Sequence, residues 1–218
     1  MKRYKHILQD RADAAIKLMD TIPMQKLKDE KWVTVAVSKG GLALGALITA
    51  KYKTRLEALF MAPIMAPNNP ECEVARVSET QEIVINEMLV NSFEIQYDYI
   101  YGEAHRKHEE DILSYIYQYR KGRPFPSMKQ EVVLLVDEGS ETGSRLMTAL
   151  KSILIQKPKA VYIATPVLPP EVLELLEPFV DDIYYLYEIE DFVETSLYYK
   201  ELEKIDDEEL ETLLEENR

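Results

Sequence analysis

The sequence contains a single cysteine, Cys72, so it cannot form a disulfide bond within the chain. Disulfides are common in secreted proteins and rare in reducing compartments, so this scarcity favours the cytoplasm. A catalytic role for Cys72 is an alternative, but a free cysteine in a loop is more often incidental. The single cysteine therefore indicates a reducing compartment, and it does not decide whether Cys72 has a catalytic role.

Long hydrophobic runs are also missing. No apolar run reaches the roughly 18–20 residues that a membrane-spanning helix needs. Charged residues interrupt the basic N-terminal segment at helical spacing, so it lacks the unbroken apolar core of a secretory signal. We therefore expect a cytoplasmic protein without a membrane partner.

Positive charge is scarce relative to negative charge. The chain has 26 Lys and Arg against 39 Asp and Glu, a formal net charge of −13. A nucleic-acid backbone selects for basic surface, so we expect no nucleic-acid partner. Much of the acid lies at residues 203–218, where leucines at helical spacing predict an amphipathic C-terminal helix with an acidic face.

Apolar segments of two periodicities alternate along the chain. The β-branched run at 32–37 is typical of a strand buried on both faces, and later strand-like and helix-like segments follow in turn. This alternation predicts an α/β fold with an open, mainly parallel sheet covered by helices on both faces. We expect strands at 32–37, 56–62, 132–136, 160–165 and 181–187, and helices within 7–28 and at 42–52, 97–120, 143–156 and 169–178.

The length of 218 residues suits one domain with a substantial core. Between residues 63 and 95 the pattern changes, because proline and asparagine become frequent and the apolar runs become short. We therefore predict a single domain over 1–218, with a small insertion or flap at 63–95 and the acidic helix at 203–218.

Glycine is rare, and four of the seven glycines fall in two turns that follow apolar strands. In open α/β sheets, ligands bind at the carboxyl ends of strands, where both turns are expected. In the turn at 137–144, a strand tip with two carboxylates is followed by two glycines and by hydroxyl side chains at a helix start. Carboxylates suit sugar hydroxyls, and a helix N-terminus suits a phosphate. The alternative to a ligand site at 137–144 is an ordinary turn between a strand and a helix that binds nothing.

The earlier turn, 38–41, has a hydroxyl, a cation and two glycines after a buried strand. Backbone amides and one lysine can bind a pyrophosphate in such a turn. Its sequence is Ser38-Lys39-Gly40-Gly41, and a Gly-Gly pair alone is a weak signal.

The two turns in this order, about a hundred residues apart, resemble those of the type I phosphoribosyltransferases. The segments "VVLLVDEGSETGS", "PNNPECE", "RKGRPFP" and "ATPVLPPEVLELL" look like landmarks of one branch of this family, over roughly residues 4–214. The resemblance implies ribose-binding and catalytic roles for Asp137 and Glu138. It implies 5-phosphate binding by Gly139, Ser140, Glu141, Thr142, Gly143 and Ser144, and pyrophosphate binding by Ser38, Lys39, Gly40 and Gly41.

The resemblance also implies an enzyme of nucleotide metabolism. Its substrate would be 5-phosphoribosyl-1-pyrophosphate or a nucleoside monophosphate, with Mg²⁺ bound through the substrate and no protein residue binding metal directly. A nucleobase-like acceptor would displace pyrophosphate from ribose C1, and the protein would contribute positioning and charge stabilisation. A homodimer is the expected assembly. Residues after the last strand, Phe192, Tyr198 and Tyr199, are candidates to contact the base.

Three positions depart from the family pattern. Glu138 is one methylene longer than the usual Asp, and Glu141 adds a negative charge to the phosphate loop. Two outcomes would reconcile Glu141 with a phosphate: its side chain points to solvent, which we favour, or it pairs with Arg145. Ala62-Pro63 stands where relatives carry a basic pair, so Lys53 and Arg76 are candidates to supply the missing cation.

Two further hypotheses therefore stay open beside the enzyme. The first is a regulatory module that binds phosphoribosyl pyrophosphate or a nucleotide with little or no catalysis. The second is an interaction protein whose pocket is vestigial, with the acidic helix and a tyrosine-rich helix as its working surface.

Overall fold

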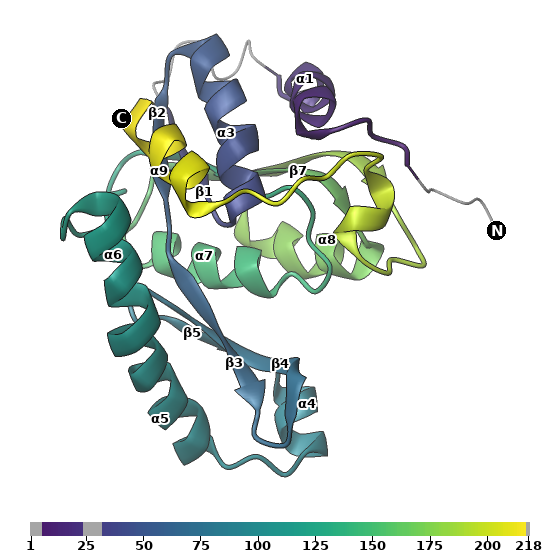
Figure 1. Ribbon diagram of the computed structural model, residues 1–218. Coiled ribbons are helices and arrows are strands. Elements are labelled where there is room, and N and C mark those ends of the chain that lie inside the picture. Colours follow the sequence, from purple (N-terminus) through teal and green to yellow (C-terminus); the bar gives the residue numbers. More distant parts are fainter. Residues whose placement is uncertain (1–5, 24–31, 217–218) are drawn as a thin grey trace.

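The computed structural model describes residues 6–23 and 32–216 (Figure 1). Its centre is a five-stranded parallel sheet with the strand order β2-β1-β6-β7-β8. β1 and β6 are buried along their whole length, as expected for apolar strands covered on both faces. The strands are β1 (Trp32–Ala36), β2 (Arg55–Ala58), β6 (Val132–Val136), β7 (Ala160–Leu168) and β8 (Asp182–Glu188).

Helices cover both faces of this sheet, as the alternating pattern predicted (Figure 1). α1 (Arg11–Thr21) and α3 (Lys39–Tyr52) pack on one face, where Leu18, Leu44 and Ile48 are fully buried. α7 (Ser144–Leu154) and α8 (Pro170–Leu176) pack on the other. Part of the helical pattern predicted over 7–28 lies outside the described residues.

A second, antiparallel sheet with the order β3-β4-β5 extends from the first one. It consists of β3 (Met61–Ala66), β4 (Asn69–Ser78) and β5 (Ile83–Ile85), and α4 (Glu87–Ser92) follows it. The single strand predicted at 56–62 is wrong, because the chain leaves the parallel sheet after Ala58 and enters the second sheet at Met61. β3 buries alternate residues, so it has only one face in the core.

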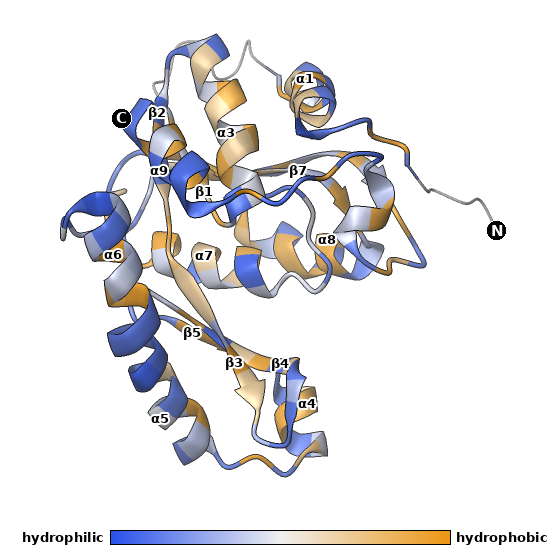
Figure 2. Cartoon of the chain, in the orientation of Figure 1, coloured by the Kyte–Doolittle hydropathy of each residue, from blue (hydrophilic) through white to orange (hydrophobic). Residues whose placement is uncertain are grey.

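The helix predicted at 97–120 is present, with one π-helical turn inside it. It comprises α5 (Tyr97–Lys107), the π-turn His108–Ile112 and α6 (Leu113–Arg120). This helix packs along the second sheet, and its outer side is hydrophilic, whereas α3 is largely hydrophobic (Figure 2). No helix in the described ranges is both long and apolar enough to cross a membrane.

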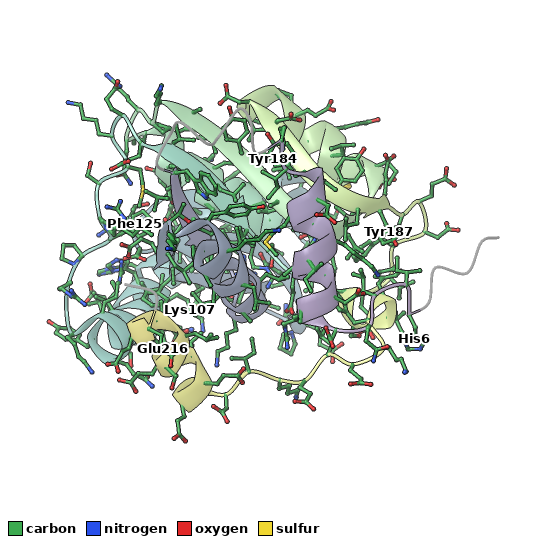
Figure 3. All side chains as sticks on the ribbon, turned by 90° about the horizontal axis from the view of Figure 1, so that it is seen from above. His6, Lys107, Phe125, Tyr184, Tyr187 and Glu216 are labelled. Atoms are coloured by element: carbon green, nitrogen blue, oxygen red, sulfur yellow. The ribbon has the colours of Figure 1, made fainter. Side chains whose placement is uncertain are left out.

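The N-terminal segment of the described chain pairs beside the sheet with a segment that follows β8. Leu8 forms a parallel bridge with Tyr199, and the His6 ring nitrogen Nδ1 lies 2.8 Å from the Tyr199 carbonyl oxygen. From there an extended segment runs across the molecule to α9 (Asp207–Glu216), the acidic C-terminal helix, as the view from above shows (Figure 3). This segment passes both glycine turns, because Tyr199 contacts Glu138 and Asp207 contacts Lys39.

Candidate functional site

Asp137 follows β6 directly and is completely buried at the tip of this strand. Its Oδ1 accepts hydrogen bonds from the Ser38 hydroxyl (2.5 Å) and from the Glu138 amide (2.9 Å). Its Oδ2 lies 3.5 Å from Nε of Arg145 but has no hydrogen-bond partner among the described residues. Because buried polar atoms are almost always hydrogen-bonded, Oδ2 is the atom of this site that most needs a ligand or a water.

Asp137 thereby joins the two predicted turns, since Ser38 belongs to the first and Asp137 to the second. The Asp137 carboxylate also raises the pKa of the Arg145 guanidinium, so this arginine stays charged beside it. The sequence suggested Arg145 only as a partner for Glu141, whereas in the structure Arg145 pairs with Asp137.

Glu138, the second predicted ribose-binding carboxylate, forms an ion pair in this structure. Its Oε2 accepts a hydrogen bond of 2.8 Å from Nε of Arg11, at the start of α1. A Cβ built on Gly40 would lie 1.9 Å from the carboxylate carbon, so Glu138 rests directly on the first turn. Burial raises the pKa of Glu138, and the nearby Arg11 charge lowers it in part.

The first turn, 38–41, forms the N-terminus of α3. Ser38 is the N-cap residue, and its hydroxyl accepts a hydrogen bond of 2.9 Å from the Gly41 amide. Lys39 forms an ion pair of 2.7 Å with Asp207 of α9. The turn therefore lies at the positive dipole end of α3, as expected of an anion site, while its lysine is directed to the C-terminal helix.

The second turn, 139–144, leads into α7, which starts at Ser144 with Gly143 as N-cap in the left-handed region (φ 73°). The Ser140 amide donates to the Val167 carbonyl of β7 at 3.1 Å. The Thr195 side chain covers Gly139, because a Cβ built there would lie 2.5 Å from Cγ2 of Thr195. Thr195 is buried, and its hydroxyl is a second buried polar atom without a hydrogen-bond partner in the described parts of the chain.

Glu141 is exposed, and its Oε1 accepts a hydrogen bond of 3.0 Å from the Thr195 amide. The predicted partner, Arg145, pairs with Asp137 instead. The Thr195 amide begins the short 3₁₀ helix Thr195–Tyr198, so the Glu141 carboxylate caps a helix N-terminus. The negative charge of Glu141 therefore contacts the segment that follows β8.

A cavity of about 770 Å³ separates the second turn from the second sheet. From β4, Arg76 and Glu73 form an ion pair in this cavity, and the Ser144 hydroxyl donates to Glu73. Arg76 is the register partner of Pro63, so it stands beside the position that lacks a basic residue. Lys53, by contrast, caps the distant C-terminal end of α3. Of the two candidate cations, only Arg76 lines this cavity.

The residues predicted to contact a base lie after β8. Tyr198 and Tyr199 are buried in the core beside α1 and α3, and Phe192 packs on Tyr198 with a ring-centroid distance of 4.8 Å. The Tyr199 hydroxyl donates to the Glu138 carbonyl at 2.7 Å, so it supports the second turn. Base contact by these residues stays a prediction.

Sequence reasoning did not identify Arg11, Thr195 and Glu73. Each reaches the site from an element that is distant in the sequence, and none belongs to a motif. The acidic tip at 137–138 gave the one available signal, because a buried carboxylate requires a cation or a hydrogen-bond donor nearby. Across the described residues, no cluster of three or more His, Cys, Asp or Glu side chains could hold a metal ion.

Comparisons with known proteins give distant relatives. No family model matches the sequence. TT1426 from Thermus thermophilus, a solved structure, is 26% identical and aligns over 96% of this chain and 98% of its own, with a TM-score of 0.77. A solved hypoxanthine-guanine phosphoribosyltransferase from Bacillus anthracis is 16% identical over 91% of this chain and 94% of its own, with a TM-score of 0.48.

Among curated proteins, the Mycobacterium tuberculosis protein named "Putative phosphoribosyl transferase Rv0571c" is 19% identical over 177 residues, or 81% of this chain. These residues span 39% of that relative, so this chain matches about two fifths of its length. The topology of the five-stranded sheet and these similarities together confirm that the chain resembles the type I phosphoribosyltransferases.

Proposed function

We propose that the protein is a phosphoribosyltransferase that binds 5-phosphoribosyl-1-pyrophosphate with Mg²⁺ and transfers the phosphoribosyl group to a nucleobase-like acceptor. Asp137 would accept hydrogen bonds from the ribose hydroxyls, and the 139–144 turn would bind the 5-phosphate. The 38–41 turn would bind the pyrophosphate. In the reaction, a ring nitrogen of the acceptor forms a bond to C1 as the C1–O bond to pyrophosphate breaks. A homodimer is part of this proposal.

The observation that carries the proposal is Oδ2 of Asp137, a buried carboxylate oxygen at a strand tip without a hydrogen-bond partner among the described residues. An unsatisfied buried polar atom costs about 1–3 kcal/mol, so a ligand hydroxyl that reaches it gains affinity. The Asp137 charge would also stabilise the positive charge that develops on the sugar as pyrophosphate leaves. This effect requires no movement of Asp137, because Ser38 and the Glu138 amide already fix it.

The donor set at this edge fits Mg²⁺, which prefers oxygen ligands and usually keeps several waters beside substrate phosphates. Oδ2 of Asp137, which pairs with Arg145 but accepts no hydrogen bond among the described residues, is the carboxylate oxygen that would face a substrate-bound ion. When bound, the ion would neutralise charge on the pyrophosphate leaving group.

A second candidate function, a binding module without catalysis, is favoured by the first turn. Lys39 is paired with Asp207, and the Glu138 carboxylate lies on Gly40, where the pyrophosphate was predicted. A protein in which these contacts persist would bind the ribose phosphate part of a nucleotide and would release no pyrophosphate.

Isothermal titration of phosphoribosyl pyrophosphate with Mg²⁺ into wild type and an Asp137→Asn variant tests the proposed function. We expect saturable binding to wild type and about a hundredfold weaker binding to the variant, or about 2.7 kcal/mol. Asp98→Asn, in the exposed first turn of α5, is the matched control and should bind like wild type.

A screen of nucleobases for pyrophosphate release then separates the two candidate functions. Release with one base supports the transferase. Binding without release from any base supports the binding module, and equal binding by wild type and Asp137→Asn would contradict both.

A further inference from the structure

The Glu138 side chain lies against the N-terminal turn of α3. Its carboxylate lies against Gly40, in the first turn of this helix, where amides have no partner within the helix. A negative charge is favourable there because of the helix dipole. The protein's own carboxylate therefore stands where the proposed function places the pyrophosphate of the substrate.

The two anions exclude each other at this position. Even a single added carbon on Gly40 would lie 1.9 Å from the Glu138 carboxylate, so no phosphate oxygen fits between them. Two negative charges in contact in a partly buried site also repel strongly. A pyrophosphate that approaches the first turn at Gly40 therefore has to displace the Glu138 side chain.

When Glu138 moves away, Arg11 loses its carboxylate partner. Its Nη1 also donates to the Glu203 carbonyl at 2.7 Å, a bond that does not depend on Glu138. Arg11 is the first residue of α1, and the N-cap Asp10 accepts the Asp13 amide at 2.8 Å. The cap fixes the start of α1, and the Glu203 carbonyl holds the guanidinium when Glu138 leaves. The Arg11 side chain is 17% exposed, within reach of an incoming anion.

Resting on the proposed function, we propose that Arg11 is a pyrophosphate-binding residue and that Glu138 acts as its exchangeable counter-ion. When the pyrophosphate binds, Glu138 rotates off Gly40, and Arg11 exchanges the carboxylate for phosphate oxygens. An arginine suits this exchange, because its planar donors bind carboxylate and phosphate with the same geometry. Glu138 then becomes available to the ribose hydroxyls, the role that the family resemblance implies for it.

Inorganic pyrophosphate with Mg²⁺, titrated calorimetrically, isolates this step because it carries no ribose. We expect Arg11→Ala to weaken binding at least tenfold. Lys17→Ala removes a cation from the same helix, where Lys17 pairs with Asp13, and should bind like wild type. Glu138→Gln removes the competing charge and keeps Arg11, so it should bind pyrophosphate several-fold more tightly than wild type.

Parallel titrations with phosphoribosyl pyrophosphate separate this inference from the proposed function. If wild type binds both ligands and Arg11→Ala binds them as Lys17→Ala does, the inference is wrong and the proposed function stands. Weaker pyrophosphate binding by Glu138→Gln than by wild type would also overturn it, even if Arg11→Ala did not fold. If neither wild type nor Glu138→Gln binds either ligand, both proposals fail.

Discussion

The two glycine turns look alike in the sequence but differ in what surrounds them. The 38–41 turn is covered by elements from elsewhere in the chain, with Glu138 on Gly40 and Asp207 on Lys39. The 139–144 turn borders the large cavity beside the second sheet, and its Ser144 reaches Glu73 across that cavity. Charged side chains thus cover part of the first turn, which borders a cavity of about 200 Å³, whereas the second turn borders the cavity of about 770 Å³.

This difference bears on the proposed function. Helix amides and a cation attract negative groups, and here the chain itself provides them at the first turn. Under the proposed function, a ligand at the first turn would compete with these internal partners, whereas a ligand beside the second turn would meet the unsatisfied atoms of Asp137 and Thr195. The proposal therefore predicts that affinity depends on how easily Glu138 and Asp207 leave the first turn.

The largest expected effect is on stability, and it differs between the two glycines of the first turn, Gly40 and Gly41. A Cβ on Gly41 would lie 2.4 Å from the Val136 carbonyl oxygen, which is backbone and cannot yield. We expect Gly41→Ala to lower the free energy of unfolding by about 3 kcal/mol, at the upper end for overpacking. On Gly40 the neighbour is the end of the flexible Glu138 side chain, so Gly40→Ala should cost less than about 1 kcal/mol.

Urea denaturation of both variants measures this difference, and Gly102→Ala is the control, since nothing lies within 4 Å of its added Cβ. Equal losses for the Gly40 and Gly41 variants would show that Glu138 is fixed rigidly on the first turn, contrary to the exchange that we propose.

A smaller effect concerns pH. The folded-state pKa of Glu138 lies above its ordinary value because of burial, so the folded protein binds this proton more tightly than the unfolded chain. The resulting stabilisation is fully present below the ordinary pKa and is lost as the pH rises through the raised one. Lowering the pH from neutral toward 4.5 should therefore raise the Tm of wild type more than that of Glu138→Gln.

The control for this experiment is Glu174→Gln, an exposed residue of α8 whose variant should follow the wild-type pH response. Glu79, which is buried beside Arg120, also has a raised pKa and should give wild type and both variants a shared pH dependence. Identical pH profiles for wild type and Glu138→Gln would contradict the burial of this carboxylate.

The smallest expected effect concerns the ion pair between Lys39 of the first turn and Asp207 of α9. Lys39 and Asp207 are more than half exposed, so their ion pair is screened by water and salt. Asp207→Ala should lower the Tm slightly, because it also removes a hydrogen bond to the buried Tyr119. It should strengthen pyrophosphate binding by about twofold at low ionic strength, an effect that salt removes. Glu216→Ala, at the far end of α9, should change neither quantity.

Much of the fold could be predicted from local patterns. The strands at β1, β6, β7 and β8 and the helices between them follow from runs that are apolar at a period of two or of 3.6 residues. The boundary between β2 and β3 could not be predicted, because residues 56–62 are apolar on both sides of it. Which sheet each half joins depends on partners far away in the sequence, Val33 to Ala36 for β2 and Val77 for β3.

The same division holds for the site. The sequence by itself determined which groups stand at the strand tips, because two apolar strands end in Ser38 and Asp137, and parallel strands bring their carboxyl ends to one edge. Only the tertiary structure decided the partners of the charged groups, since Glu138 meets Arg11 across 127 positions and Glu141 meets Thr195 across 54. A charge is satisfied by whatever lies within a few ångströms, and in a folded chain that distance is independent of sequence separation.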